Sequence, residues 1–276
     1  MMSTSRTILI TGATDGIGKA AAVALAETGA HILVHGRNPQ RALAAVESIK
    51  KESGSSAIEP VVADFASLKQ VRQLVTEIIN RCDRLDVLVN NAGVLMNDRV
   101  VTEDGFELTF QVNHLAHFLL TNLLLDLLKK SAPSRIINVS SMVHGSAKIE
   151  FDNLQGEKNY SGYSAYGRSK LANILFTHEL AERLRGTSVT VNALHPGVIA
   201  TKLLRAGFGG FWGGGVKKGA ETIVYLATSP EGGTVTGKYF VNRTQAESSV
   251  RSNDTKLQKE FWRVSERMAE IIGSPE

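Results

Sequence analysis

A tyrosine and a lysine that could carry out proton chemistry lie four residues apart, at Tyr166 and Lys170, with Ser169 between them. On a helix, residues four apart share one face, so the two side chains should lie close together. An ammonium at that distance favours the phenolate and lowers a phenol pKa from about 10 toward neutral pH. A phenol tuned in this way can donate or accept a proton while a hydride moves. The spacing also occurs by chance, and Tyr166 could instead be a buried tyrosine whose hydroxyl is hydrogen-bonded.

A glycine-rich turn near the N-terminus supplies a setting for such chemistry. The run 11–18 follows a short apolar strand and precedes an alanine-rich helix. This order is typical of a phosphate-binding turn: Gly12 allows the tight turn, Gly16 lets the backbone approach a pyrophosphate, and Gly18 lets helix and strand pack closely. The helix N-terminus then faces the anion. A plain strand-to-helix turn is the alternative.

The elements that must position these residues alternate between short apolar strands and longer helical segments. Strands are predicted at 7–10, 31–35, 58–63, 85–90, 135–140, 189–195 and 238–241, and helices at 19–27, 41–51, 67–79, 110–130, 163–184, 218–227 and 257–272. The strands lack regular polar alternation, which favours a parallel sheet covered on both faces. The sequence therefore predicts one α/β domain over 1–276, a doubly wound Rossmann-type fold with a parallel sheet flanked by helices.

Composition and charge disfavour several other classes of protein. The 276 residues are 43% hydrophobic and 21% charged, as in soluble globular proteins. The net charge is +4, but the basic residues are scattered, so we expect no nucleic-acid partner. The single cysteine, Cys82, excludes an intrachain disulfide and fits a reducing compartment. No apolar signal segment precedes the first strand, and 118–128 is too short and polar to cross a bilayer, so we expect a cytoplasmic protein without a membrane partner.

Three ordered motifs together resemble the short-chain dehydrogenase/reductase family. They are the turn with Gly12, Gly16 and Gly18, the run Asn-Asn-Ala-Gly at 90–93 after the fourth strand, and Tyr166 with Lys170. The resemblance extends from residue 7 to about residue 240. It implies a Rossmann-type fold, a nicotinamide dinucleotide cofactor, and hydride transfer between that cofactor and a carbonyl or alcohol.

The resemblance also implies catalytic roles for four residues. Tyr166 would be the general acid in reduction and the base in oxidation, while Lys170 would lower its pKa and bind the nicotinamide ribose. Ser141 would hydrogen-bond the substrate oxygen. Its neighbour Ser140 is a rival, because side chains alternate along a strand and only one should face the site; the family motif favours the second serine. Asn113 would hold a water in a proton relay to Lys170.

Cofactor choice depends on the end of the second strand. NAD-preferring proteins place an acid there, whereas this chain has Arg37, whose guanidinium suits a 2′-phosphate, so NADP (NADPH) is favoured over NAD. Asp15 is an objection, because a carboxylate near phosphate is unfavourable. Asp64 and Phe65 would contact the adenine ring, and 196–201 the nicotinamide carboxamide. The remaining predicted cofactor residues are Gly12, Thr14, Asp15, Gly16, Ile17, Gly18, Asn91, Ala92, Gly93, Tyr166, Lys170, Pro196, Gly197, Val198 and Thr201.

An insertion points to one branch of the family. Ser141 and Tyr166 are 25 residues apart, about twice the usual interval, and this insertion, together with 111–115 and 170–173, resembles the retinol dehydrogenase-like branch. That branch acts on retinoids and other apolar aldehydes, ketones or alcohols, and we expect the insertion to bulge as a loop.

A glycine-rich segment suggests how the substrate is covered. The segment 207–215 combines glycines with Phe208, Phe211 and Trp212. We expect the loop from 201 to about 216 to close over an apolar small molecule. A subunit contact is the alternative for these aromatic residues.

The remaining expectations concern assembly, metals and the rival function. The family often forms dimers or tetramers through the two long helices, so a homo-oligomer is expected unless the insertion or the C-terminal extension blocks them. His114 and His117 lie one turn apart, but no third ligand follows at a suitable spacing, so no metal site is predicted. A non-catalytic dinucleotide-binding regulatory protein is the alternative function, and the combination of Ser141, Tyr166 and Lys170 argues against it.

Overall fold

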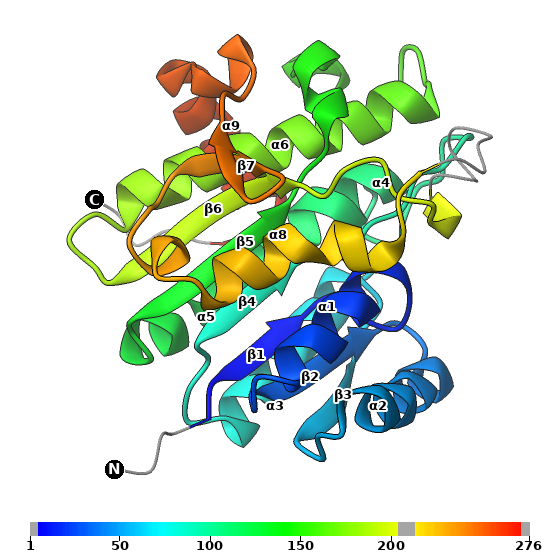
Figure 1. The fold of residues 1–276 in the computed structure, drawn as a ribbon. Coiled ribbons are helices and arrows are strands. Elements are labelled where there is room, and N and C mark those ends of the chain that lie inside the picture. The colour runs from blue at the N-terminus through cyan, green and yellow to red at the C-terminus, as the bar shows by residue number, and fades with distance from the viewer. Residues whose placement is uncertain (1–4, 204–212, 272–276) are drawn as a thin grey trace.

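An eight-stranded sheet forms the centre of the computed structural model, which describes residues 5–203 and 213–271 (Figure 1). The strand order is β3-β2-β1-β4-β5-β6-β7-β8, parallel except for the β7–β8 pair. The order reverses between β1 and β4, which opens a crevice at the carboxyl ends of the strands. The strands are β1 (Thr7–Ile10), β2 (His31–Gly36), β3 (Ile58–Val62), β4 (Val87–Asn90), β5 (Ser134–Val139), β6 (Val189–His195), β7 (Lys238–Val241) and β8 (Thr244–Ala246).

Helices cover both faces of this sheet, and each layer buries its own apolar core (Figure 1). One face carries α1 (Gly16–Ala26), α2 (Pro39–Ser53) and α8 (Val216–Thr228). The other carries α3 (Leu68–Arg81), α5 (Ala116–Lys130), α6 (Gly162–Arg183) and α9 (Thr255–Met268). The predicted doubly wound α/β architecture is therefore confirmed. In the part of the chain that the structure describes, no helix combines the length and apolar character needed to cross a bilayer.

Local capping explains where several helices begin and end. Asn38 accepts a hydrogen bond from the Arg41 N–H at the start of α2, with Pro39 in the first turn, and Gly54 ends the helix in the left-handed region at φ 72°. These are the residue types favoured at helix ends. The caps were visible in the sequence, and the predicted helix 41–51 is correct to within two residues at each end.

The long helix predicted at 110–130 is interrupted near its start. It consists of α4 (Leu108–Phe110), a π-helical turn η1 (Gln111–Leu115) and then α5. Single π turns inside helices are frequent at functional sites. Here the turn contains Asn113, one of the predicted catalytic residues.

The insertion between β5 and α6 is packed rather than bulging as a simple loop. It contains two short 3-10 helices, η2 (Met142–Ser146) and η3 (Phe151–Asn153), and Leu154 joins the core. Arg168 on α6 is buried and donates to the Asn153 and Leu154 carbonyl oxygens at 2.7 and 2.6 Å. A buried guanidinium bonded to two carbonyls fixes the insertion to the helix that carries Tyr166.

The C-terminal helix α9 lies against the two long helices. Phe261 packs its ring 4.9 Å from that of His114, and Trp262 lies 4.8 Å from Phe118 and 5.8 Å from Phe176. Both α9 residues are buried. A second copy of the chain could pack on this face of α5 and α6 only by displacing α9, which bears directly on the expected oligomer contact.

Candidate active site

Two glycines bring the first two cofactor motifs into contact. Gly12 has φ +63°, and a Cβ there would lie 2.7 Å from the Cα of Ala92. A Cβ on Gly18 would lie 2.5 Å from Asn91 Nδ2. No side chain fits at such distances, so the glycine turn and the segment after β4 approach as closely as backbones can.

Hydrogen bonds then lock these two segments together. The Asn91 amide donates to the Thr11 and Gly12 carbonyl oxygens at 2.8 and 3.2 Å. Thr11 Oγ1 accepts from the Asn91 and Ala92 N–H groups at 2.8 and 2.9 Å. Asn91 therefore holds the turn in shape with its side chain. Sequence analysis missed the part played by Thr11, although its place between β1 and Gly12 was the available signal.

Two buried histidines support the same turn. His117 Nε2 lies 2.9 Å from Thr11 Oγ1, and His35 Nδ1 accepts from the Gly12 N–H at 3.2 Å while Nε2 donates to the Ala63 carbonyl at 3.0 Å. Burial lowers the pKa of His35 to about 4 and that of His117 to about 3. Both rings are therefore neutral at pH 7. Neither histidine was predicted to support this turn, because nothing in the sequence marks either as close to Gly12.

Phe65 does not offer its ring to an adenine. The ring stacks on His35 at 4.3 Å and meets His117 edge-on at 5.3 Å, and the residue is only 3% exposed. The ring thus belongs to the core beneath the glycine turn, so the predicted contact of Phe65 with an adenine would have to come from its backbone. Asp64 is partly exposed and caps its own turn through the Ala66 N–H at 2.9 Å.

Asp15 is paired, which weakens the objection to a phosphate beside it. Its Oδ1 accepts from the Gly16 N–H at 2.8 Å, and its Oδ2 lies 2.5 Å from Lys202 Nζ. The Lys202 hydrogen bond, with further help from the Gly16 N–H, lowers the pKa of Asp15. The pair joins the segment after β6 to the glycine turn.

Thr14 and Ile17, which flank Asp15 among the predicted cofactor residues, lie in different surroundings. Thr14 faces the end of β2, where a Cβ on Gly36 would be 2.4 Å from its Cγ2. Ile17 packs against α8, 2.9 Å from the place of a Cβ on Gly219. Ile17 therefore positions the start of α1 by packing against α8.

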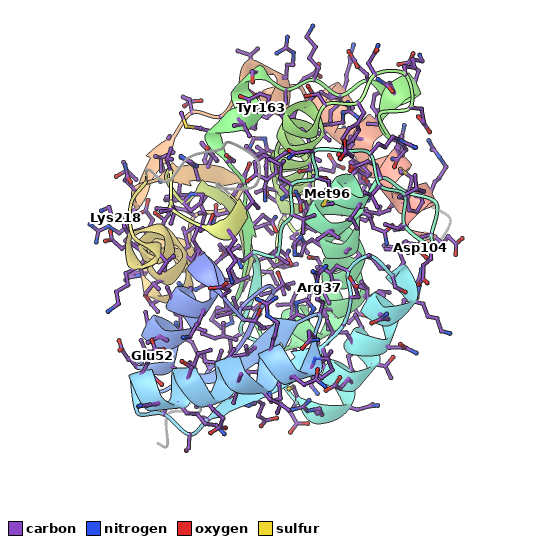
Figure 2. All side chains as sticks on the ribbon, turned by 90° about the vertical axis from the view of Figure 1, so that its right-hand side faces the viewer. Arg37, Glu52, Met96, Asp104, Tyr163 and Lys218 are labelled. Carbon is purple, nitrogen blue, oxygen red and sulfur yellow. The ribbon has the colours of Figure 1, made fainter. Side chains whose placement is uncertain are left out.

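Arg37 lies at the end of β2 and is exposed. Within the described residues no carboxylate forms a salt bridge with it. Figure 2 shows Met96 between Arg37, near the middle of the drawn face, and Tyr163, nearer its upper end. Tyr163 is in the first turn of α6, three residues before Tyr166. The face therefore extends from the predicted 2′-phosphate site to the predicted catalytic helix.

The catalytic candidates gather where β5 meets α6. Tyr166 is buried and its hydroxyl hydrogen-bonds the Ser141 side chain. Lys170 Nζ donates to the Val139 carbonyl at 3.0 Å and lies 5.4 Å from the centre of the Tyr166 ring. Ser140 instead donates to the Lys170 carbonyl at 2.7 Å and is buried. Of the two rival serines, Ser141 is thus the one beside the tyrosine hydroxyl.

The acidity of Tyr166 differs from the sequence expectation. Burial raises the pKa of Tyr166 to about 12, and the hydrogen bond with Ser141 only partly opposes this. Burial also lowers the pKa of Lys170 to about 8. Burial therefore outweighs the lowering of the phenol pKa that was expected from Lys170, whose Nζ donates to the Val139 carbonyl and lies over the ring.

Asn113 ties the segment after β4 to α6. Its Oδ1 accepts from the Val94 N–H at 2.7 Å, and its Nδ2 donates to the Val94 carbonyl at 2.9 Å and to Ser169 Oγ at 3.0 Å. These bonds use both Nδ2 hydrogens and one of the two lone pairs of Oδ1, and the relay through a water stays a prediction. A Cβ on Gly93 would lie 3.4 Å from Asn113 Oδ1 and 3.6 Å from Lys170 Nζ, which places the predicted cofactor glycine against both residues.

The segment after β6 crosses the same crevice. Gly197 has φ +93°, the Val198 carbonyl accepts from the Gly214 N–H at 2.8 Å, and the Ala200 N–H donates to the Gly214 carbonyl at 3.1 Å. Thr201 approaches the glycine turn, 3.7 Å from the place of a Cβ on Gly16. Most of the predicted substrate loop, including Phe208, Phe211 and Trp212, lies outside the described residues.

The histidines that suggested a metal have other partners. His114 Nε2 lies 2.9 Å from Ser265 Oγ, while His117 is bonded to Thr11 and to the Asn113 carbonyl. Over 5–203 and 213–271, no three His, Cys, Asp or Glu side chains are grouped as a metal site requires.

Comparison with known proteins agrees with this geometry. A model of the family described as short chain dehydrogenase matches residues 6–208. The chain belongs to the short-chain dehydrogenase family. Human retinol dehydrogenase 14 is 43% identical, with 97% of this chain and 87% of the relative aligned, and human retinol dehydrogenase 13 is 43% identical over 95% and 84%. The resemblance to the retinol dehydrogenase-like branch is thereby confirmed.

Solved structures give the same assignment for this short-chain dehydrogenase. A protein from Mycobacterium paratuberculosis superposes with a TM-score of 0.81 at 32% identity, covering 96% of this chain and 93% of that one. A short chain dehydrogenase from Shigella flexneri 2a, solved in complex with NADP, has a TM-score of 0.68 at 26% identity, covering 87% and 97%. The protein is therefore an oxidoreductase of a family that binds a nicotinamide cofactor and acts on small molecules.

Proposed function

We propose that this short-chain dehydrogenase uses NADPH to reduce a carbonyl group of an apolar small molecule. One observation carries the proposal: the Tyr166 hydroxyl is bonded to Ser141, and Lys170 Nζ lies both 5.4 Å from the centre of the Tyr166 ring and 3.6 Å from the place of a Cβ on Gly93 of the cofactor motif. Hydride transfer to a carbonyl requires a proton donor beside the bound cofactor, and this crevice offers both a proton donor and a backbone that can bind the cofactor.

The residues present fit a dinucleotide phosphate. Gly12 and Gly18 leave no room for side chains and form the backbone cradle, and the N-terminus of α1 faces a pyrophosphate. Arg37 is exposed and suits a 2′-phosphate, and its freedom from a carboxylate partner among the described residues supports NADP over NAD. The NADP complex of the Shigella neighbour and the NADPH complex of one from Escherichia coli are in line with this choice. When bound, the nicotinamide supplies the hydride.

The chain's own residues manage the proton. A pKa near 12 keeps Tyr166 protonated at pH 7, which is the form that must donate to the substrate oxygen during reduction. Ser141 hydrogen-bonds the same oxygen and so holds it near the phenol. Lys170, with its pKa lowered to about 8, can gain or lose a proton near neutral pH and would hold the nicotinamide ribose. This division of roles favours reduction over oxidation at neutral pH.

An apolar substrate is supported by the side chains around Tyr166. Met142, directly after Ser141, is 60% exposed, and Tyr163 is 49% exposed. Met96 lies on the same face (Figure 2). The names of the human relatives point to a retinoid, which belongs to the same class of long apolar aldehyde or alcohol.

The function is tested by turnover with a panel of carbonyl compounds. Purified protein should oxidise NADPH in the presence of retinaldehyde, straight-chain aldehydes of increasing length or aromatic ketones, and kcat/KM should rise with apolar length. Binding of NADPH without turnover of any carbonyl or alcohol would support the non-catalytic alternative and contradict the proposal.

Cofactor choice is tested at Arg37. Arg37→Ala should weaken NADPH by roughly tenfold or more and leave NADH nearly unchanged, because only NADPH carries the phosphate that the guanidinium pairs with. Lys51→Ala, which removes an exposed cation from the last turn of α2, is the matched control and should change neither KM. Equal effects of Arg37→Ala on both cofactors would argue against NADP preference.

A further inference from the structure

His144 is a buried histidine next to the catalytic serine, and the mechanism above gives it no part. It lies in η2, three residues after Ser141, and is 5% exposed. Its Nδ1 is 2.7 Å from the Ser141 carbonyl oxygen, and its Nε2 is 3.1 Å from the Ser249 backbone nitrogen. The ring also meets Tyr239 edge-on at 5.0 Å.

These two bonds determine the tautomer of the ring. A backbone N–H can only donate, so Nε2 must carry the lone pair that accepts from Ser249. A carbonyl can only accept, so Nδ1 must carry the proton that is donated to Ser141. His144 is therefore neutral with its proton on Nδ1. Burial lowers the pKa of His144, which maintains the neutral ring, and the bond to the Ser141 carbonyl only partly opposes this.

The Nε2 edge of the ring contacts a segment, beginning at Ser249, that is hydrogen-bonded to α6 and α9. The Ser249 hydroxyl caps η5 (Val250–Asn253) by accepting from the Ser252 N–H at 3.3 Å. The Ser252 carbonyl in turn accepts from His178 Nδ1 on α6 at 2.9 Å and from Gln258 Nε2 on α9 at 2.7 Å. The segment that holds His144 is thus fixed by residues on α6 and α9.

The Nδ1 edge of the His144 ring is linked to Tyr166 through a single residue, Ser141. Ser141 accepts at its carbonyl from both Nδ1 and the backbone N–H of His144, the latter at 3.2 Å. The Ser141 hydroxyl accepts from the Val143 N–H at 3.5 Å, a long contact that orients it weakly, and hydrogen-bonds Tyr166. The imidazole bond, at 2.7 Å, is shorter than the contacts of Ser141 with the backbone N–H groups of Val143 and His144.

We infer that His144 is a positioning residue. The Nδ1 proton that it donates to the Ser141 carbonyl holds Ser141 against Tyr166, and the bond from the Ser249 N–H to Nε2 selects the tautomer that carries this proton. This role rests on the proposed function of Ser141 and Tyr166. Through Ser249, the C-terminal segment thereby helps to position a catalytic residue. A displacement of a catalytic group by about 1 Å can lower the rate by up to about 100-fold, so loss of the His144 bond to Ser141 should lower kcat.

Two amide substitutions separate the two bonds. In His144→Asn the side-chain amide lies near the place of Nδ1 and can still donate to Ser141, but the acceptor for Ser249 is lost. In His144→Gln the amide oxygen can lie near the place of Nε2 and accept from Ser249, but the donor to Ser141 is lost. We expect His144→Asn to keep kcat within about threefold and His144→Gln to lose roughly 10- to 100-fold, with little change in the KM for NADPH in either.

A matched control removes a bond from the same anchor without touching Ser141. His178→Gln weakens the contact with the Ser252 carbonyl, so it should lower the Tm while leaving kcat nearly unchanged. If kcat falls equally in both His144 variants, or falls in all three in proportion to the loss in Tm, His144 has only a structural part and the inference is wrong.

The tautomer provides a test that needs no substrate. Long-range ¹H–¹⁵N spectra of the full chain with bound NADPH, with His144 assigned through its variants, should show protonated Nδ1 and unprotonated Nε2. A ring protonated on Nε2, or on both nitrogens at pH 7, would overturn the inference. This outcome is independent of whether any carbonyl is reduced, so a failure of the proposed function would be recognised separately.

Discussion

Side chains around the glycine turn hydrogen-bond to the backbone and fix its position, whereas several side chains near Tyr166 are exposed to solvent. Thr11, Asn91 and His117 bond to one another's segments and to backbone groups, and Thr11 and His117 are buried. Met142 and Tyr163, next to the catalytic residues in the chain, are about half exposed or more. Under the proposed function, the first group would form the cofactor half of the site and the second would line the substrate half.

The difference corresponds to what each half must recognise. A dinucleotide pyrophosphate is the same in every turnover, and a site for it can be built from mutually dependent buried bonds. Exposed apolar side chains contribute little to the core, so they can be changed for another substrate at small cost in stability. We therefore expect substitutions in the cofactor half to affect folding and binding together, and substitutions in the substrate half to affect turnover alone.

The largest expected effect is at the reacting hydroxyl. Tyr166→Phe should lower kcat by roughly 1,000-fold, because it removes the proton donor, and general acid catalysis contributes about 100- to 10,000-fold. NADPH binding, followed by the fluorescence of the reduced nicotinamide, should change little. Activity that survives in this variant would show that the proton comes from another group.

The next effect tests the cofactor half. Gly18→Ala places a methyl group 2.5 Å from both Asn91 Nδ2 and the Gly12 carbonyl oxygen, so the two motifs must separate. We expect NADPH affinity to fall by roughly tenfold or more and the Tm to fall with it. Gly215→Ala is the control, because a Cβ there meets nothing within 4 Å. A variant with weaker binding but an unchanged Tm would break the proposed link between folding and binding in this half.

Acid should destabilise the fold through its buried histidines, two of which, His35 and His117, support the glycine turn. The folded-state pKa values are about 4 for His35 and about 3 for both His114 and His117, below the unfolded value of about 6.5. The unfolded chain therefore binds more protons below pH 6.5. The stabilisation is complete above that pH and is lost as the pH falls, by up to about 1.4 kcal/mol per pH unit for each ring.

Urea unfolding at pH 7.5, 6.5 and 5.5 measures this slope. Carboxylates titrate mainly at lower pH, so the histidines should dominate between 6.5 and 5.5. His117→Gln should reduce the slope. A free energy of unfolding that stays constant across the range would contradict the neutral, buried state of these rings.

The smallest expected effect is at the ion pair that joins the halves. Lys202 and Asp15 have side chains 79% and 51% exposed, and exposed pairs contribute at most about 1 kcal/mol. Lys202→Ala should change the KM for NADPH by less than about threefold, and added salt should reduce even that. A change above tenfold would place Lys202 within the cofactor half.

Most elements of the fold were accessible from local patterns. The strands predicted at 7–10, 189–195 and 238–241 have the observed bounds, because each is a short apolar run between turn residues. Strand β8 was missed, since its three residues are all exposed and carry no apolar pattern. The π turn at Gln111–Leu115 was missed too, because its sequence has ordinary helical composition and its partners lie elsewhere in the chain.

The sequence by itself determined the doubly wound fold, the position of the glycine turn and the presence of Tyr166 and Lys170 on one helix, because these depend on neighbours within a few residues. Only the tertiary structure decided that Ser141 rather than Ser140 meets Tyr166, that the Phe65 ring faces inward and that burial makes the phenol less acidic. Those outcomes depend on desolvation and on bonds between distant residues, such as Ser249 with His144, 105 positions away. No local pattern encodes such pairs.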